Sequence, residues 1–487
     1  MRKSLLRQVT LYNHRYTFGV MVFLTLLIAV LVFRLDLAPT GLTSSEMQSS
    51  VTSATWNISQ PLSQPLIDAP YHLLQKLSLS VLGLNEWGII APSLLLGLVT
   101  GLAFVLMVQR WFKLNVALIA GLIFISSAAF LTLARTGTPM IMTTFWLSII
   151  LLAATNILHP ESRSRLWGPV LLVAVPLSLY TPLMIYPLIA IGIAGLLHPH
   201  VRFMARKMKN LHYVLAVIVI ITLLGPLVAS IVADPQQLYR LFGIPETTPS
   251  MREILTNLSV IATSFFSIGS TQVGFIPQPI FGAASLILIL LGLIKTLVDR
   301  YSARSYMLLL WSLFFIPIAI LNPNELLICL IPAYLFMAIG IETLIREWYK
   351  LFPLNPYARM AGLIPLTVLL GGIIVSNSAQ YFYGYFYGTP KERYSEQLRA
   401  TNDFIKNTPQ GTKITVVTIS GQAGFYDLLR RDHDNVAISI AAAKRPAGDV
   451  IIHQGATYAP GEFGVPTRIV ASYKKASDQV IAREFRQ

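Results

Sequence analysis

The sequence contains a single cysteine, Cys329, and few charged residues: Asp, Glu, Lys and Arg make up 12% of its 487 residues. One cysteine provides neither a disulfide framework nor a thiolate metal site of the usual spacing. A soluble protein of average composition carries about 25% charged residues, so roughly half of that charge is missing. With 54% hydrophobic residues, the chain also lacks the composition of a disordered protein. These absences exclude a plain cytoplasmic enzyme and an intrinsically disordered chain.

Long apolar runs take the place of the missing charge. A helix needs about 20 apolar residues to cross the hydrocarbon core of a bilayer, and eleven runs bounded by charge or proline approach this length. Pro176, Pro182 and Pro187 interrupt the stretch that holds the fifth and sixth runs, so a single kinked or re-entrant segment is the alternative there. The eleven predicted spans are approximately 17–35, 88–108, 115–134, 138–157, 167–180, 182–198, 211–233, 279–297, 305–321, 325–345 and 359–377.

The distribution of Lys and Arg predicts the orientation of these spans, because short cytoplasmic loops carry an excess of them. With the amino terminus inside, the inner segments hold 18 of the 37 cations and the outer connections before residue 378 hold 5. The net charge of +15 therefore indicates topology and not nucleic-acid binding. Phe33, Arg34, Leu35 and Asp36 provide no small-residue cleavage site, so the first span should remain as an anchor. We expect an integral plasma-membrane protein with a cytoplasmic amino terminus.

An odd number of spans places the carboxyl-terminal part outside the cytoplasm. We therefore predict an α-helical membrane domain over 1–377 and a small extracytoplasmic α/β domain over 378–487. In that tail, we predict a helix over 391–407, strands over 414–419, 436–440, 450–453, 469–473 and 480–485, and a short helix after the first strand. An aromatic belt over 381–387 should mark the bilayer surface.

Two outer segments of the membrane domain are long enough to form a site: 36–87 and 234–278. The first begins with a polar stretch and continues with residues 71–82, in which Tyr71, Leu74, Leu77 and Val81 recur at helical spacing. This pattern predicts an amphipathic helix on the outer membrane surface. The second contains MREILTNLSVIATSFF, a possible short helix, and carries Arg240 and Arg252.

The candidate site residues lie along these outer segments. Glu46 is an acid in a polar run, so it could act as a general base or bind a divalent metal ion; the alternative is a solvated loop residue. Arg135 ends the third span, and its guanidinium should face the outer loops, where it could pair with a lipid phosphate or extend to bulk headgroups. Asp68 and His72, four residues apart, form a weak metal-binding hypothesis, and each alone is more often structural.

The order of these features resembles the polytopic GT-C glycosyltransferases. The similarity is carried by the first span, the acidic outer loop, the surface helix and LNEWGIIAPSLLLGLVTGLAFVLMVQRWFKLNVALIAGLIFISSAAFLTLARTGTP, and more loosely by PNELLICLIPAYLFMAIGIETL. Within that fold family, the chain looks like the group that contains protein O-mannosyltransferases, aminoarabinose lipid A transferases and bacterial membrane glycosyltransferases of lipopolysaccharide core galacturonosylation. Many members carry a small α/β domain on the outer face.

The resemblance implies an inverting transfer of one sugar from a polyprenyl phosphate carrier to a hydroxyl acceptor on a protein, lipid or cell-surface glycan. The family's first loop has an Asp-Glu pair, which corresponds here to Ser45-Glu46, and Arg135 falls on an Arg associated with the carrier. Other positions depart from the pattern: Asp68-Ala69-Pro70 replaces a cation before a Pro pair, Ala91-Pro92 replaces an Arg, and Met140 replaces an acid.

The leading hypothesis is therefore a membrane sugar transferase in which Glu46 is the base. Arg135, with Arg240 or Arg252, would neutralise the phosphate leaving group. The missing Asp and cations leave a second hypothesis open, a non-catalytic relative that binds a lipid carrier or glycan in an envelope assembly complex. A transporter of lipid-linked sugars is the third. No cofactor is predicted beyond the possible divalent metal ion.

Overall fold

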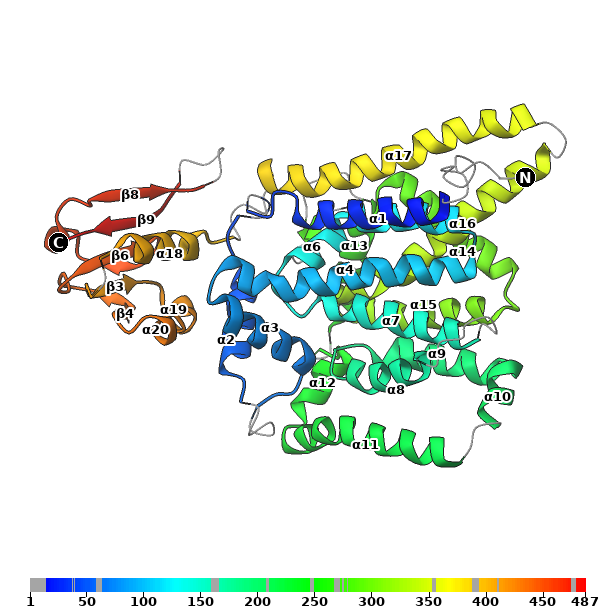
Figure 1. The fold of residues 1–487 in the computed structure, drawn as a ribbon, viewed down its shortest axis with the longest axis horizontal. Helices are drawn as coiled ribbons and strands as arrows, with labels where there is room; N and C mark the ends of the chain where they lie inside the picture. Colours follow the sequence, from blue (N-terminus) through cyan, green and yellow to red (C-terminus); the bar gives the residue numbers. More distant parts are fainter. Residues whose placement is uncertain are drawn as a thin grey trace, which may run out of the picture.

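In the computed structural model, a bundle of long helices carries a small α/β domain at one end, so the chain has two parts (Figure 1). Helices α2 and α3 lie at the end of the bundle that meets this domain, and α10 lies at the opposite end. The structure describes residues 15–36, 38, 40–57, 64–158, 166–206, 210–245, 249–266, 272–273, 276–277, 279–352, 356–387, 394–409, 411–473 and 479–487.

All eleven predicted spans coincide with apolar helices. Six helices are long and apolar enough to cross a membrane, and a seventh span is possible if the bent pair α5 and α6 counts as one. The protein is thus an integral membrane protein, although the count of eleven is not established. The helices of the bundle are α1 (Arg15–Val32), α4 (Glu86–Trp111), α5 (Leu114–Ser126), α6 (Ala128–Arg135), α7 (Ile141–Leu158), α8 (Trp167–Ser178), α9 (Ile185–Leu197), α10 (Pro199–Arg206), α11 (Asn210–Ala233), α14 (Ala283–Val298), α15 (Ala303–Leu321), η3 (Pro323–Cys329), α16 (Leu330–Leu351) and α17 (Pro356–Tyr387).

The third predicted span is broken, since α5 and α6 meet at an angle of 64°. The break lies at Ser127, whose backbone is extended and whose side chain accepts a hydrogen bond from the Phe130 amide. The Ser126 and Ser127 hydroxyls donate to the carbonyls of Ile123 and Phe124 at 3.1 and 2.7 Å. Polar side chains thereby satisfy part of the backbone that the break leaves without helical partners.

The buried core of the bundle is formed mainly by α4, α5, α6, α7 and α16. Helices α14 and α16 pack closely because glycines face each other across the contact. A Cβ at Gly292 would overlap the Phe336 carbonyl, and one at Gly340 would overlap the Leu288 carbonyl. Small residues at such crossings let helix backbones approach within a bilayer.

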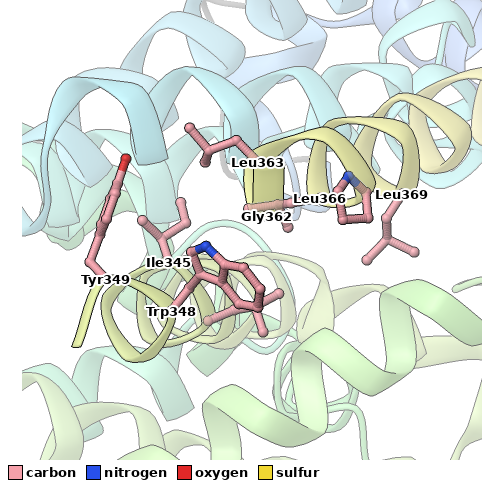
Figure 2. A pocket seen from close by; sticks show the side chains of 9 residues that line it. Ile345, Trp348, Tyr349, Gly362, Leu363, Leu366 and Leu369 are labelled. Carbon is pink, nitrogen blue, oxygen red and sulfur yellow. The ribbon is translucent and has the colours of Figure 1, made fainter. Parts of the chain in front are cut away.

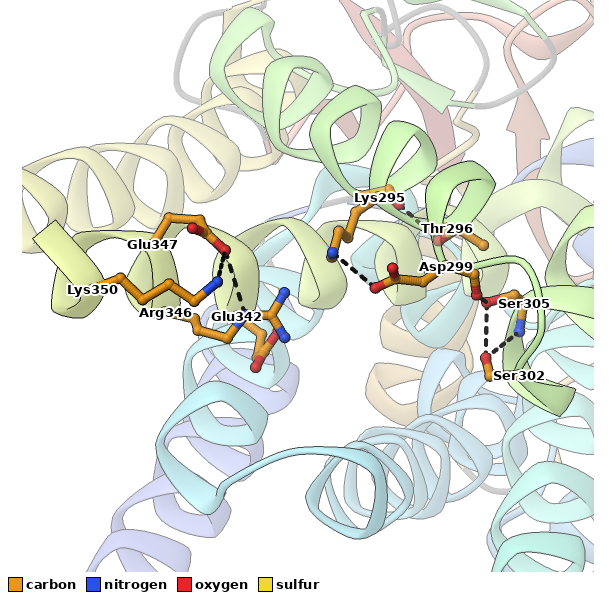
Figure 3. A network of polar contacts seen from close by, with 10 residues as sticks. Lys295, Thr296, Asp299, Ser302, Ser305, Glu342, Arg346, Glu347 and Lys350 are labelled. Carbon is orange, nitrogen blue, oxygen red and sulfur yellow. Dashed lines mark hydrogen bonds and ion pairs between the residues drawn. The ribbon is translucent and has the colours of Figure 1, made fainter.

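Ion pairs lie at the ends of α14 and α16 that point away from the α/β domain (Figure 3). Lys295 pairs with Asp299 at 2.8 Å, and Lys350 pairs with Glu347 at 2.9 Å. Arg346 lies 3.5 Å from Glu342. Such exposed pairs contribute little to stability, about 0 to 1 kcal/mol each, but they neutralise these cations at the surface.

The first outer segment folds as two helices, α2 (Ser44–Thr55) and α3 (Ala69–Leu82). Helix α3 is the predicted amphipathic helix. Leu77 and Val81 are 62% and 73% exposed, whereas Tyr71 and Gln75 are fully buried against the protein. Exposed leucine and valine side chains on one face fit a helix that lies on a membrane. The polar stretch before α3 was not predicted to be helical, yet much of it forms α2.

The second outer segment contains α12 (Gln236–Phe242), α13 (Met251–Phe266) and the paired strands β1 (Gln272–Val273) and β2 (Ile276–Pro277). The helix predicted in the sequence MREILTNLSVIATSFF is confirmed as α13. Leu241 of α12 packs with Trp56 and Leu66 of the first outer segment, so the two outer segments meet at the same end of the bundle.

The tail forms a five-stranded sheet in the order β4-β3-β6-β9-β8. Strands β4, β3 and β6 run parallel to one another, and β9 is antiparallel to both of its neighbours, β6 and β8. All five predicted strands are confirmed, and the predicted helix is α18, although its part before residue 394 lies outside the described residues. The elements are α18 (Gln397–Asn407), β3 (Ile414–Val417), α19 (Ser420–Tyr426), α20 (Leu429–Asp432), β4 (Val436–Ser439), β5 (Ala441–Ala442), β6 (Asp449–His453), β7 (Thr457–Tyr458), α21 (Pro460–Phe463), β8 (Arg468–Ala471) and β9 (Val480–Phe485).

The tail domain is attached to the first outer segment. Leu42 forms a β-bridge with Ser395, with the Leu42 amide 2.9 Å from the Ser395 carbonyl. Arg431 donates to the Ala54 carbonyl at 3.0 Å. Helix α17 continues ten residues beyond the predicted end of the last span, so the predicted aromatic belt forms its final turns. Tyr381 is fully buried there and Tyr383 is 66% exposed.

Candidate functional site

The candidate site is built around Glu46, the third residue of α2. Thr43 precedes the helix in an extended conformation, and its hydroxyl accepts a hydrogen bond from the Glu46 amide at 3.2 Å. The Glu46 Oε2 atom accepts hydrogen bonds from the Thr43 amide at 2.8 Å and from the Thr43 hydroxyl at 2.9 Å. This reciprocal arrangement is a capping box, which satisfies amides that a helix start leaves free. The local sequence therefore explains why α2 begins at Ser44.

The other carboxylate oxygen of Glu46 reaches a distant segment of the chain. Glu46 Oε1 accepts a hydrogen bond from the Gly137 amide at 2.7 Å, in the turn between α6 and α7. The side chain is only 1% exposed. Burial raises the pKa of the Glu46 carboxyl, while the hydrogen bonds from Thr43 and Gly137 oppose that rise. Glu46 is therefore a buried, hydrogen-bonded carboxyl and not a solvated loop residue.

Only glycine fits at position 137. A Cβ there would lie 2.8 Å from the Ile89 carbonyl oxygen and would overlap the Ile89 side chain. The turn after α6 can therefore approach the beginning of α4 closely enough for its amide to reach Glu46. The missing side chain at position 137 thus allows the turn after α6 to lie close to both α2 and α4.

Gln75 of α3 connects the same segments. Its Oε1 atom accepts hydrogen bonds from Ser49 at 2.8 Å and Ser53 at 2.7 Å, both on α2. Its amide nitrogen donates to the carbonyls of Ile89 at 3.1 Å and Gly137 at 3.0 Å. Gln75 is fully buried, and every strong hydrogen-bonding group of its side chain has a partner. It therefore fixes α2, α3, α4 and the turn at 137 relative to one another.

His72 lies beside this network. Its Nδ1 atom is 2.8 Å from the Ser53 hydroxyl, and its ring stacks on Trp56 at 5.5 Å. Since the single Ser53 proton is donated to Gln75, the His72 ring donates from Nδ1 to Ser53. Burial lowers the pKa of His72 to about 4, so the ring is neutral at physiological pH. A neutral imidazole in this position aligns α3 with α2.

Asp68 has a different environment. It precedes α3 with φ of 55°, a left-handed conformation that is uncommon for a residue other than glycine. Its amide donates to the Tyr180 carbonyl at 2.8 Å. Burial raises the pKa of the Asp68 carboxyl to about 8, the Thr181 hydroxyl opposes this rise, and the charge of Glu325 adds to it. Asp68 is thus an acid with a buried carboxyl whose neutral form is favoured, at the junction of α3 with the turn between α8 and α9.

Asp68 and His72 therefore have separate partners, although they are four residues apart. Within the described ranges, no group of three or more His, Cys, Asp or Glu side chains is arranged to hold a metal ion. The metal site that the sequence suggested at Asp68 and His72 therefore has no third ligand of these types among the described residues.

Arg135 does not face the outer loops, which corrects the sequence expectation. Its side chain is fully buried, and it donates to the carbonyls of Phe33 at 2.9 Å and Val30 at 3.4 Å. The guanidinium also lies over the ring of Tyr381 at 5.3 Å. The bend between α5 and α6 brings Arg135 against the end of α1, where exposed carbonyls and the helix dipole favour a cation. Arg135 thereby joins α1, α6 and α17.

Arg240 and Arg252 are exposed, on α12 and α13 respectively. Neither makes a hydrogen bond or ion pair with Glu46, Asp68 or His72 among the contacts of the described chain. The structure therefore brings Glu46, Gln75 and His72 into one network, places Asp68 at its edge, and leaves the three arginines outside it.

Gln75 and Gly137 were missed by sequence reasoning. A buried glutamine on a helix with several other polar residues carries no spacing that distinguishes it. The Thr43-x-x-Glu46 spacing was a readable signal for a helix start, and it would have placed Glu46 within α2. The hydrogen bond to Gly137 joins residues 91 positions apart, which no local pattern predicts.

Two small pockets lie elsewhere in the structure. One of about 230 Å³ lies between α3 and the tail domain and includes Lys76, Arg431 and Asp432. The other, of about 240 Å³, lies between α16 and α17, where the Trp348 indole lies against Gly362 (Figure 2). The second is lined by apolar residues and Tyr349, so it offers no acid or base. The first is close to α2 and α3, at the end of the bundle that meets the tail domain.

Residues 69–225 match the family model described as dolichyl-phosphate-mannose-protein mannosyltransferase. This segment begins at α3 and includes the turn at Gly137. No protein of curated function matches the sequence.

Solved structures match over nearly the whole chain. ArnT from Cupriavidus metallidurans bound to undecaprenyl phosphate matches with a TM-score of 0.51 and 13% identity, over 96% of this chain and 97% of that chain. Its apo state matches with a TM-score of 0.51 and 14% identity, over 96% and 98%. The archaeal oligosaccharyltransferase AglB from Archaeoglobus fulgidus, in complex with an inhibitory peptide and a dolichol-phosphate, has a TM-score of 0.50 and 9% identity, over 91% and 70%. The resemblance predicted from the sequence is confirmed.

Proposed function

Because the chain has the fold of the GT-C polytopic membrane glycosyltransferases, we propose that it transfers a sugar from a polyprenyl-phosphate carrier to a hydroxyl group of an extracytoplasmic acceptor. The observation that carries this proposal is the likeness, along almost the full length of both chains, to a protein whose structure holds undecaprenyl phosphate. The match of residues 69–225 to a mannosyltransferase family supports the same reaction class. The acceptor is a protein, a lipid or a cell-surface glycan.

The proposed topology has eleven spans, a cytoplasmic amino terminus and an extracytoplasmic tail in the plasma membrane, with 1–377 as the membrane domain and 378–487 as the tail domain. Helices α2 and α3 and the tail lie together at one end of the bundle (Figure 1). Arg110, Lys295, Arg304 and Lys350 belong to the opposite ends of their helices. This separation of charge supports the orientation expected from the positive-inside rule.

In the proposed reaction, the Glu46 carboxylate takes the proton of the acceptor hydroxyl. The acceptor oxygen then forms a bond to the anomeric carbon of the sugar. The bond from that carbon to the phosphate oxygen breaks, and polyprenyl phosphate leaves with the electron pair. Attack opposite to the leaving group inverts the configuration. Glu46 Oε1 accepts one hydrogen bond, from the Gly137 amide, so it keeps a lone pair for the proton of the acceptor. Because the Glu46 side chain is only 1% exposed, the surrounding segments must move before an acceptor can reach it.

The developing phosphate charge requires cations. Arg240 and Arg252 are exposed on the outer segment that meets α2 and α3, so they are the proposed contacts for the leaving group, with Asp68 and His72 in the substrate-binding region. Arg135 would join them only after leaving the α1 carbonyls that hold it. A divalent ion at Glu46 would likewise require the network to open.

The experiment is complementation of a deletion strain, followed by mass spectrometry of its surface glycans and glycoproteins. Glu46→Gln should abolish the sugar transfer that the wild type restores. Thr43→Ala is the matched control, because it breaks the same capping box and keeps the carboxylate. Glu253→Gln removes an exposed outer carboxylate and should leave transfer unchanged. Full transfer by a stably inserted Glu46→Gln protein would exclude Glu46 as the base.

One observation favours a second candidate, a non-catalytic relative that binds a lipid carrier or glycan in an assembly complex. Glu46 and Arg135 are both buried and hydrogen-bonded within the protein, as structural residues are. A glycan that disappears on deletion but persists when Glu46→Ala and Arg135→Ala are combined would support this candidate over the transferase.

A further inference from the structure

A pocket of about 570 Å³ lies far from the candidate site, at the other end of the bundle. It is formed where α4, α7 and α9 end and where α15 begins, and residues from α8 and α10 complete it. All of these helix ends belong to the side opposite to the tail domain (Figure 1). Its volume is in the range of about 300 to 1,000 Å³ that small-molecule sites occupy.

The walls and the mouth of this pocket differ in chemistry. Leu151, Leu158 and Ile191 contribute to an apolar wall, whereas Arg110 and Arg304 contribute positive charge. Not one acidic side chain lines the pocket in the described chain. A site with cations at one end and hydrocarbon along its walls is complementary to an amphiphile with a negative head.

Arg304 is held in place without a carboxylate. Its guanidinium donates to the Trp111 carbonyl at 3.3 Å and lies over the Phe112 ring at 5.1 Å. The Trp111 indole in turn donates to the Thr155 hydroxyl at 3.2 Å, which fixes the ring at the pocket. The remaining N–H groups of Arg304 are therefore positioned for an outside acceptor.

Arg110 is exposed at the same pocket. Lys295, Arg346 and Lys350, at the same end of the bundle, pair with carboxylates (Figure 3). By contrast, neither Arg110 nor Arg304 has a carboxylate within ion-pair distance across the ranges that are described. Asp299 and Glu342 act on Arg304 only at longer range, so the charges of Arg110 and Arg304 are not neutralised by a direct ion pair in the described chain.

His198 adds a third polar group. Its Nδ1 atom is buried and has no hydrogen-bond partner in the described part of the chain, and the residue lines the pocket. A buried polar atom without a partner is unfavourable unless a ligand or water satisfies it. A phosphate oxygen can accept a hydrogen bond from a ring nitrogen at this place.

We propose that this pocket binds the phosphate of an anionic phospholipid from the membrane leaflet on this side, with Arg110, Arg304 and His198 around the head and an acyl chain along the apolar wall. Basic pockets between membrane helices near the cytoplasmic surface suit such headgroups. A zwitterionic choline lipid has the same phosphate, but its ammonium group would meet two arginines. The site is separate from the sugar-transfer site and its occupation does not depend on transfer.

The test uses the full-length protein in nanodiscs of equal parts phosphatidylglycerol and phosphatidylcholine, extracted into detergent for native mass spectrometry of retained lipids. The double variant Arg110→Gln with Arg304→Gln should retain phosphatidylglycerol about tenfold less well, as expected for the loss of charge-assisted hydrogen bonds. Arg110→Gln alone, at an exposed position, should give a smaller loss. Arg300→Gln removes a cation on the same side, outside the pocket, and should retain phosphatidylglycerol as the wild type does.

A second measurement locates the lipid. Brominated phosphatidylglycerol should quench the fluorescence of Trp111, which is measured as the difference between the wild type and Trp111→Phe. The variant that combines Arg110→Gln with Arg304→Gln should lose this quenching. Equal phosphatidylglycerol retention by wild type and double variant would overturn the proposal, as would equal retention of phosphatidylcholine by the wild type. Displacement of the lipid by glycerol phosphate at matched concentration would assign the pocket to a soluble phosphate compound instead.

Discussion

Gln75 is the residue on which four segments of the candidate site depend. Replacing it by Leu would leave the hydroxyls of Ser49 and Ser53 and the carbonyls of Ile89 and Gly137 without their partner. A buried polar group that loses its partner costs about 1 to 3 kcal/mol. We therefore expect Gln75→Leu to lower the free energy of unfolding by at least about 2 kcal/mol, measured by thermal unfolding of the purified protein.

Gln48 provides the matched control for this substitution. It lies on the exposed face of α2, so Gln48→Leu makes the same chemical change without breaking the network. Its melting temperature should stay close to that of the wild type. Equal melting temperatures for Gln75→Leu and Gln48→Leu would contradict the role assigned to Gln75.

The raised pKa of Asp68 predicts that the stability of the protein depends on pH. In the unfolded chain the pKa of this carboxyl is near 3.8, and in the folded protein burial raises it to about 8. Between these values the folded protein keeps a proton that the unfolded chain releases, so stability falls as pH rises. Asp68→Asn should remove this contribution and flatten the fall in melting temperature with rising pH.

Between pH 6.5 and 8, the contribution of Asp68 to the pH dependence of stability can be measured without that of His72. The pKa of His72 falls from 6.5 to about 4 on folding, so the stability linked to His72 is lost only as pH drops below 6.5. Asp36→Asn, at an exposed position, is the control and should keep the wild-type slope. The assignment fails if Asp68→Asn also keeps that slope.

At the scale of helices, the contact between α14 and α16 depends on two glycines. Gly340→Ala would place a methyl group into the Leu288 carbonyl of α14, and the helices would have to separate. Overpacking of this kind costs about 1 to 3 kcal/mol. We expect a lower melting temperature for Gly340→Ala.

Gly371 of α17 is the control for this prediction. A Cβ at this position meets no atom within 4 Å, so Gly371→Ala should leave stability unchanged or raise it by about 0.4 to 1 kcal/mol through reduced freedom of the unfolded chain. If both alanine variants melted alike, the close approach of α14 and α16 would not limit stability.

The elements that the sequence predicted are those with a strong periodic signal. Apolar runs located the eleven bundle segments, and runs rich in valine and isoleucine located the five strands of the tail sheet. Helix α2 was missed because its sequence, SSEMQSSVTSAT, has almost no apolar periodicity. It is stabilised by the capping box and by Gln75, and tertiary contacts of this kind override weak local preference.

The site residues were predicted less completely than the elements. Glu46 lies in the network, but Arg135 is turned away from the outer loops because of the bend at Ser127. Serine is compatible with both a continuous and a broken membrane helix, so the sequence does not reveal this bend. The direction of Arg135 follows from packing against α1 and α17, which are far from it in sequence.

At the scale of the whole molecule, the proposed topology predicts which surfaces reach which side of the membrane. Cys329 is buried, so it gives little background in thiol labelling. A cysteine at exposed Ser420, in the tail domain, should react with a membrane-impermeant maleimide in intact cells. A cysteine at exposed Arg300, between α14 and α15, should react only after permeabilisation.

The reverse pattern at these two positions would invert the proposed orientation. Reaction at both in intact cells would indicate that the number of spans between them is not as proposed. Because Ser420→Cys and Arg300→Cys are both exposed, a difference in labelling reports the side of the membrane and not burial.

The bend between α5 and α6 also has a consequence for how the protein is made. Helix α5 has 13 residues, a length of about 20 Å, which is shorter than the hydrocarbon core of about 30 Å. Neither half of the pair can cross the bilayer alone, and the backbone at the break needs protein partners. The neighbours that enclose this segment include α16 and α17, which are synthesised about 200 residues later. Helices α1 and α4, which are synthesised before this pair, contact it as well. The enclosure of the third span therefore begins with them and is completed only by the last helices, as a late step of biogenesis.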